Sequence, residues 1–338
     1  MVSICLTLLL PTQASTATLQ QQLEQAITSF GSGDYASSYW QFENMELDYG
    51  TEPEFLARSF QQTILPVRGY AALMADRPTD ALIYFGELLS QYQPHPGLQA
   101  FALYNAAIAQ SQTHALAVAA QTFHHFQLTF PGSNEAALAL LQEADLRYEI
   151  GDGATATALL DAFYESEGPE TLRMQARLRA LQIAGETDST DRAREILFES
   201  DWNVAAMPDI AVLSFAALDA GDLLLSAGHY SEAVRAYRLT LPRKVLIDKQ
   251  RERLQVVESA LAQQSLFASS IWKSHSQQLV ARLTRQLELL ENMADYTPGL
   301  YLRSGQAYLL GLRYREATIQ FRTVAQTPEF ESDTRAEA

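Results

Sequence analysis

The stretch PGLYLRSGQAYLLGLRYREATIQFRTVAQTP, residues 298–328, decides the fold. Its apolar and small residues recur at spacings of three, four and seven, which predicts two amphipathic helices in succession. Gly305 in the first helix and Ala317 in the second are small where the two helices must approach closely, and Phe321 fills the groove beside them. Pro328 then ends the second helix, because proline cannot continue one. This stretch therefore predicts a helix–turn–helix unit.

The same unit recurs along the chain. Residues 214–242 repeat it closely, with Gly221, Ala233 and Tyr237 in the same order. Less regular copies cover 17–50, 62–94, 100–131, 137–169 and 174–200. The small residue of the second helix falls at Ser38, Ala81, Ala119, Ala156, Ala193, Ala233 and Ala317. Successive positions are about 40 residues apart, and the last step is about twice as long, so the sequence is an internally repeated one.

The repeated pattern of Gly/Ala–Tyr, then Gly-x-Tyr-x-x-Ala-x-x-x-Phe/Tyr, then Pro resembles the tetratricopeptide repeat (TPR). The resemblance covers nearly the whole chain and is strongest at 298–328 and 214–242. It implies an all-α fold, a right-handed TPR-like α-solenoid of seven or eight helix pairs. The spacing exceeds the roughly 34 residues of the standard repeat, so we expect longer helices or longer loops.

The pattern divides the chain into four parts. Residues 1–17 predict a signal peptide, either whole or truncated at its start, and residues 18–242 hold TPR-like repeats. Residues 243–296 depart from the pattern and predict a long helical hairpin, or a stretched repeat, inserted near the C-terminal end. Residues 297–338 predict the C-terminal repeat and the start of a further repeat, which we expect to be truncated.

The N-terminus indicates export. Val2–Leu10 is apolar and small residues follow it, as in a secretory signal peptide cut after Ala14 or Ala17. It lacks a basic start, so a frayed apolar terminus is the alternative interpretation. Phe130–Ser133 also resembles a segment of periplasmic TPR proteins of the Gram-negative envelope. We therefore expect a periplasmic or envelope-associated protein. No other window reaches the ~20 apolar residues of a membrane span.

The charge excludes one large class of partner. The chain carries a net charge of −16, and up to residue 168 it has four basic residues against eighteen acidic ones. Because each phosphate contact needs a cation, we expect no nucleic-acid binding. The basic residues between 235 and 253 are interpreted as the solvated face of a long helix.

The sequence contains no catalytic constellation that we recognise. Gly151–Ala156 matches G-x-G-x-x-A, but that motif needs a strand before it, and residues 137–150 have helical periodicity. His124 and His125 are neighbours, which point about 100° apart on a helix and cannot chelate one metal. The single cysteine, Cys5, excludes an internal disulfide. We therefore expect no enzyme activity, no metal and no cofactor.

The resemblance also suggests where a partner binds, because the first helices of TPR units line the concave face. The outward positions in that register are Phe101, Tyr104, Ile108, Leu141, Asp145, Tyr148, Phe215, Leu218 and Asp222. Aromatic residues beside acidic ones would suit a basic, partly apolar peptide or helix. The alternative is that many of them pack against the next repeat. No lysine precedes residue 244, which disfavours the carboxylate-clamp subclass.

These observations predict a non-catalytic scaffold of the bacterial cell envelope that binds a partner protein or peptide on its concave face. One alternative is the helical superhelix domain of a larger envelope enzyme, such as a lytic transglycosylase, whose catalytic domain is missing. A second alternative is a cytosolic TPR adaptor, which would keep Met1.

Overall fold

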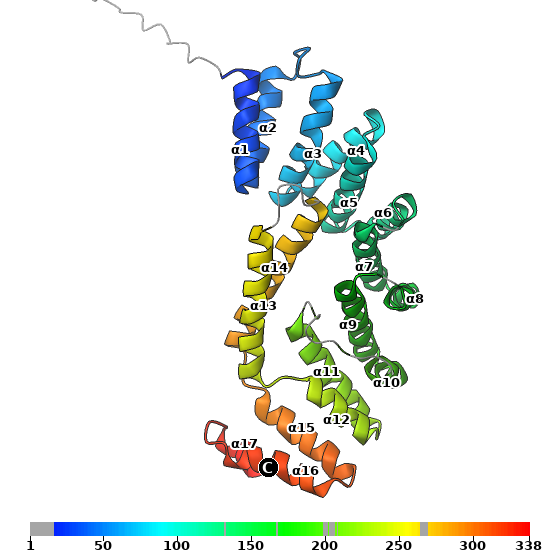
Figure 1. Ribbon diagram of the computed structural model, residues 1–338, viewed down its shortest axis with the longest axis vertical. Coiled ribbons are helices and arrows are strands. Elements are labelled where there is room, and N and C mark those ends of the chain that lie inside the picture. The colour runs from blue at the N-terminus through cyan, green and yellow to red at the C-terminus, as the bar shows by residue number, and fades with distance from the viewer. Residues whose placement is uncertain are drawn as a thin grey trace, which may run out of the picture. The chain divides into compact units, whose positions relative to one another are not determined.

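The computed structural model describes residues 17–131, 133–166, 168–198, 202, 207, 209–263 and 270–338. Within these residues all regular structure is α-helical, in seventeen helices (Figure 1). The chain is therefore the all-α, helix-pair protein that the repeat predicts. The first eight helices are α1 (Leu19–Ser32), α2 (Tyr35–Tyr49), α3 (Arg58–Met74), α4 (Pro78–Gln91), α5 (Pro96–Gln112), α6 (Leu116–Thr129), α7 (Asn134–Glu149) and α8 (Gly153–Tyr164). The others are α9 (Glu170–Glu186), α10 (Thr190–Phe198), α11 (Ile210–Ser226), α12 (Tyr230–Leu239), α13 (Arg243–Gln263), α14 (Ser270–Asn292), α15 (Thr297–Leu310), α16 (Tyr314–Gln326) and α17 (Ser332–Glu337).

The chain forms two compact units that divide between Ala119 and Ala120. In the first unit α1 packs on α2 and α3 on α4, and α2 and α4 each contact the next helix along the chain. In the second unit the pairs are α7 with α8, α9 with α10, α11 with α12, α13 with α14, and α15 with α16. Each unit is thus built of helix pairs, and in the second unit α12 contacts α15 across the intervening pair of α13 and α14.

A three-residue joint holds each regular pair together. It consists of a residue in the first helix, a small residue twelve positions later in the second helix, and a bulky residue four positions beyond that. The sets within one unit are Ala26, Ser38, Phe42; Gly69, Ala81, Phe85; Ala144, Ala156, Leu160; Leu181, Ala193, Leu197; Gly221, Ala233, Tyr237; and Gly305, Ala317, Phe321. The middle residue is at most 2% exposed in every set, which confirms the sequence prediction for these positions.

The glycines of this joint let an aromatic ring of the second helix approach the backbone of the first helix closely. A Cβ on Gly69 would lie 2.7 Å from Cε1 of Phe85, and one on Gly221 would lie 2.5 Å from Cε1 of Tyr237. Ordinary carbon contacts need about 3.5–4.0 Å. The aromatic ring therefore occupies the space that a side chain on the first helix would take, and this contact fixes the spacing of the two helices.

The turn between α7 and α8 is formed by a glycine and a capping aspartate. Gly151 adopts a left-handed conformation with φ of +87°, and the Asp152 carboxylate accepts the backbone N–H of Thr155 at 3.3 Å. The G-x-G-x-x-A segment therefore comprises the end of the turn after α7 and the first residues of α8. It follows a helix, so it lacks the strand that a dinucleotide site requires.

A separate core anchors the long helices α13 and α14 to α11. Leu246 and Ile247 of α13, Leu290 of α14 and Ala211 of α11 are buried together. The guanidinium of Arg243 donates to the carbonyl oxygens of Leu290 and Glu291 at 2.9 and 2.8 Å. This basic residue thus binds backbone within the hairpin and does not belong to a solvated face.

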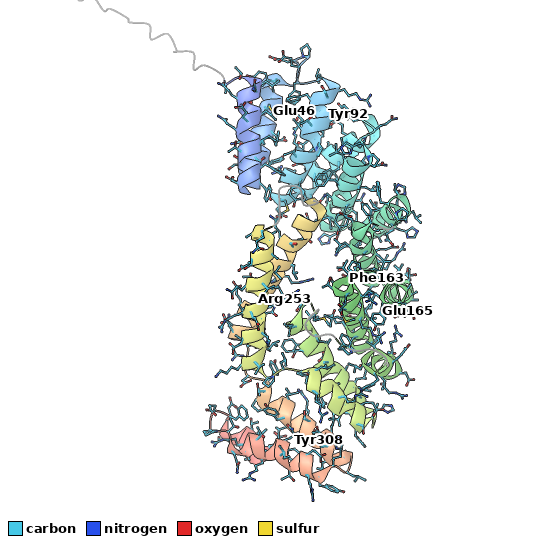
Figure 2. All side chains as sticks on the ribbon, in the orientation of Figure 1. Glu46, Tyr92, Phe163, Glu165, Arg253 and Tyr308 are labelled. Carbon is cyan, nitrogen blue, oxygen red and sulfur yellow. The ribbon has the colours of Figure 1, made fainter. Side chains whose placement is uncertain are left out.

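The neighbouring basic residues have partners as well. Arg238 of α12 donates to the hydroxyl of Tyr308 at 3.1 Å. Figure 2 labels Tyr308 on α15. Arg251 pairs with Glu291 of α14 at 2.6 Å, and the Arg235 guanidinium lies 4.4 Å from the ring centre of Phe198. The basic cluster therefore stabilises packing between helices to a greater extent than a solvated helix face would.

A buried cation links three helices of the first unit. The Arg68 side chain of α3 is 3% exposed, and its guanidinium lies 2.9 Å from the Glu43 carboxylate of α2 and also contacts Glu46. The Tyr84 hydroxyl of α4 donates to the same Glu43 carboxylate at 2.5 Å. Because the charge is paired and hydrogen-bonded, its burial is tolerated.

Candidate functional site

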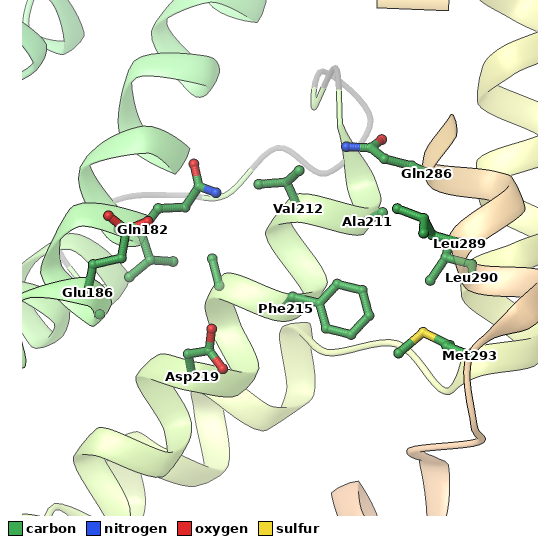
Figure 3. A pocket seen from close by; sticks show the side chains of 13 residues that line it. Gln182, Glu186, Ala211, Val212, Phe215, Asp219, Gln286, Leu289, Leu290 and Met293 are labelled. Atoms are coloured by element: carbon green, nitrogen blue, oxygen red, sulfur yellow. The ribbon is translucent and has the colours of Figure 1, made fainter. Parts of the chain in front are cut away.

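An apolar hollow lies among α9, α11 and α14 of the second unit, with a volume of about 470 Å³ (Figure 3). Its lining residues are Leu181, Gln182, Gly185, Glu186, Ala211, Val212, Phe215, Ala216, Asp219, Gln286, Leu289, Leu290 and Met293. The lining is predominantly apolar, and the volume falls in the range of ligand pockets, roughly 300–1,000 Å³. We call this site the apolar hollow.

Helical spacing places these side chains on facing surfaces. Phe215 and Asp219 are four residues apart and so share one face of α11, and Gln182 and Glu186 share one face of α9 in the same way. On α14 the lining positions follow spacings of three and four, as far as Met293 just beyond the helix. Three helices with matched stripes therefore enclose the site.

The two sides of the apolar hollow differ in chemistry. Figure 3 shows the carboxylates of Glu186 and Asp219 on the side of α9 and α11, while Leu289, Leu290 and Met293 lie on the opposite side. Leu289 is 62% exposed, although it borders an apolar surface. A ligand in the hollow would meet hydrocarbon at one side and negative charge at the other.

Asp219 makes no direct ion pair within the described residues. Asp219 has no ion-pair or hydrogen-bond partner among them, whereas Asp222 accepts the Tyr237 hydroxyl at 2.7 Å and lies 3.3 Å from Arg303. Burial, and then the charge of Asp222, raise the pKa of Asp219 above its ordinary value, and the charge of Arg303 opposes this shift. The carboxylate would therefore gain from a cation brought close to it.

A second, polar hollow of about 300 Å³ adjoins the first, and Gln182 and Val212 line both. Its lining residues are Leu141, Asp145, Glu149, Leu160, Gln175, Leu178, Arg179, Gln182, Asp209, Val212 and Arg282. Four of its five charged side chains form two ion pairs, and Glu149 has no ion pair among the described residues. Asp145 binds Arg179 at 2.7 Å, and Asp209 lies 3.6 Å from Arg282. Asp209 also caps α11 by accepting the Val212 N–H at 3.0 Å.

The structure brings together four of the nine outward positions expected in the TPR register. Phe215 lines the apolar hollow, Leu141 and Asp145 line the polar hollow, and the Tyr148 ring lies 5.0 Å from the guanidinium of Arg179 beside it. Burial raises the pKa of Asp145, and the Arg179 charge opposes this shift. The first helices α7, α9 and α11 therefore do line one continuous hollowed face.

Four other expected positions are buried or half-buried, as is Leu141 at 3% exposed. Leu218 is 8% exposed, because α11 packs against α9, α12, α13 and α15 and few of its positions remain outside. Tyr104 in the first unit is 4% exposed. Its neighbours Phe101 and Ile108 are half-buried and pack on the core of α3 and α4, with the Phe101 ring centre 5.8 Å from that of Tyr70. Tyr104, Phe101 and Ile108 are thus at least half-buried, in line with the alternative that such positions pack against neighbouring repeats.

Sequence reasoning missed the contribution of α14. Leu283, Leu287 and Leu290 form a stripe that predicts a buried face, and the structure buries Leu283 and Leu290. Leu289 and Met293 lie beside that stripe, and no periodicity tells which helix they will approach. On α9 the repeat pattern is degenerate, so Gln182 and Glu186 carry no signal in the sequence.

Two searches of the described residues gave negative results. No group of three or more histidine, cysteine or acidic residues in these ranges could hold a metal ion. His124 instead lies 3.3 Å from the Glu143 carboxylate, and this carboxylate also accepts the Gln127 amide. No described helix combines the length and apolar character that a membrane crossing requires.

Residues 81–263, more than half of the chain, match the family model described as tetratricopeptide repeat-like domain. The chain belongs to this TPR-like family. A tetratricopeptide repeat protein from Parabacteroides merdae is similar in structure, with a TM-score of 0.46 and 14% identity over 94% of this chain and 96% of that one. The apo form of the quorum sensor NprR from B. thuringiensis gives a TM-score of 0.36 and 11% identity over 90% and 97% of the two chains. A search of curated proteins found no match. Within the TPR-like frame, the apolar hollow lies on the face formed by first helices.

Proposed function

We propose that this TPR-like protein is a non-catalytic scaffold of the bacterial cell envelope that binds a partner protein on the hollowed face of its second unit. The observation that carries the proposal is the apolar hollow among α9, α11 and α14. Repeat folds use such faces to bind other proteins, and an apolar centre with a polar rim is the usual anatomy of an interface.

The envelope part of the proposal rests on the sequence. The apolar run Val2–Leu10 and the small residues after it are typical of an exported protein, and they lie outside the residues that the structure describes. Fractionation of cells and mass spectrometry of the mature N-terminus test this part. A protein that keeps Met1 and stays in the cytosol would contradict it.

The partner-binding part is tested by affinity purification from an envelope extract with two matched variants. Leu289→Arg places a cation in the apolar hollow, and Val256→Arg places one at a comparably exposed position of the same hairpin, on α13. Both side chains are more than half exposed, so neither change should disturb the core. We expect a captured protein to be lost with Leu289→Arg and kept with Val256→Arg. Capture that both variants retain would exclude the hollow as the binding site.

A further inference from the structure

Resting on this proposed function, we infer that the apolar hollow binds a peptide segment of the partner in which bulky apolar side chains adjoin a lysine or arginine. The apolar side chains would lie against α14, and the cation would lie at Glu186 and Asp219. Three features of the site lead to this assignment: its size and lining, its charge, and its contrast with the polar hollow beside it.

The size and lining favour apolar side chains. A volume of about 470 Å³ holds a few side chains rather than one. Phe215 is half-buried and its ring centre lies 5.3 Å from that of Tyr296, so it forms a supported wall. Leu289 is exposed to water at the opposite side. A ligand that covers it would remove apolar surface from water, which is favourable.

The charge favours a cation at one side only. Glu186 is 49% exposed, and its carboxylate lies 3.7 Å from Arg179, at the outer limit of an ion pair. Asp219 has no such partner among the described residues. Asp222 lies one helical turn farther along α11, so like charges adjoin. A lysine or arginine here would pair with Asp219 and relieve that repulsion.

The polar hollow offers a contrast on the same face. There Asp145 and Arg179, and Asp209 and Arg282, already pair with each other. A charged ligand would have to replace these internal pairs, and the lining offers little apolar surface. Among the described lining residues, no basic side chain lines the apolar hollow, whereas two arginines offset all carboxylates of the polar hollow except Glu149.

The test uses two synthetic peptides and the full chain. The probe is fluorescein-labelled LKKLLKLLKKLL, which combines apolar and basic side chains, and its matched partner has glutamate at every lysine. Fluorescence anisotropy measures their affinity at about 50 and about 500 mM salt, because screening separates the charge contribution from the apolar one.

Paired variants then locate the binding site. Leu289→Ser removes the apolar contact, with Val256→Ser as the control at an exposed position of the same hairpin. The double variant Asp219→Asn, Glu186→Gln removes the charge, with Glu165→Gln, Glu258→Gln as a control of equal charge away from the hollow. Of the four substituted carboxylates, only Glu186 belongs to an ion pair within the described residues.

We expect the lysine peptide to bind and the glutamate peptide not to bind. Leu289→Ser should weaken binding about tenfold at both salt concentrations, the charge variant should weaken it about tenfold at low salt only, and neither control should change it. Equal losses in the control variants would show general attraction to an acidic protein and overturn the inference. A lysine peptide that does not bind, beside a partner that is still captured from extract, would overturn it and leave the scaffold function in place.

Discussion

The joint between paired helices predicts that two glycine-to-alanine changes on one helix pair will have opposite effects. Gly69 of α3 faces Phe85 of α4, which is fully buried, and a Cβ there would lie 2.7, 2.9 and 3.0 Å from three ring carbons. Gly86 is the next residue of α4 after Phe85, and a Cβ there would have nothing within 4 Å. The two sites therefore belong to one helix pair and differ in the room that each leaves for a Cβ atom.

The magnitude follows from two terms. Replacing glycine by alanine within a helix gains about 1 kcal/mol of helix propensity at either site, so this term cancels in the comparison. Overpacking a well-filled core costs about 1–3 kcal/mol, and it applies to Gly69→Ala alone. We expect Gly86→Ala to stabilise the protein by about 0.5–1 kcal/mol and Gly69→Ala to lie about 1–3 kcal/mol below it.

Urea unfolding followed by far-ultraviolet circular dichroism measures both variants in the full chain. Adding Phe85→Leu should narrow the gap between the variants, because the smaller side chain leaves room for the new methyl group. Equal unfolding midpoints for Gly69→Ala and Gly86→Ala would refute the close-approach joint, since the clash would then have no energetic consequence.

Three further predictions concern the rest of the fold. Ala233→Arg should cost at least about 1–3 kcal/mol in urea unfolding, because Ala233 is fully buried, while Ser231→Arg on the exposed side of α12 should cost less than about 0.5 kcal/mol. Burial, and then the hydrogen bond to Asp80, raise the pKa of Tyr39 to about 12, so its contribution to stability is full below pH ~10 and is lost as the pH rises toward 12. Tyr39→Phe should therefore lose less stability than the wild type between pH ~9 and ~11.5, measured by urea unfolding. Arg243→Met should raise hydrogen–deuterium exchange at the end of α14, because two carbonyl oxygens lose a charged donor at a cost of about 2 kcal/mol.

The sequence predicts the fold well because the joint is local. A small residue, a second small residue twelve positions on and a bulky one four positions beyond lie within a single helix pair, so periodicity along the chain is enough to find them. Even the degenerate copy keeps Ala193 and Leu197 buried, although Leu181 replaces the small residue of its first helix. In this copy leucines occupy the first and third positions of the joint, and both are buried.

The candidate site is predicted less well because it depends on contacts between distant segments. Phe215 and Asp145 are found from the register of first helices, whereas Leu289 reaches the same face from α14, about eighty residues after α11 begins. The register also overestimates exposure, since Tyr104 and Leu218 occupy outward positions of a regular repeat and are buried by neighbouring helices. Helical periodicity identifies a face, and tertiary packing decides whether water reaches it.

The central claim, that a partner docks on the hollowed face of the second unit, is tested most directly by photocrosslinking in living cells. A photoreactive amino acid would replace Leu289 in the apolar hollow, Val256 on α13, or Leu47 on α2, and all three positions are exposed. The account predicts one discrete crosslinked adduct from position 289 and none from the other two. An adduct from position 47 or 256 with none from 289 would contradict it.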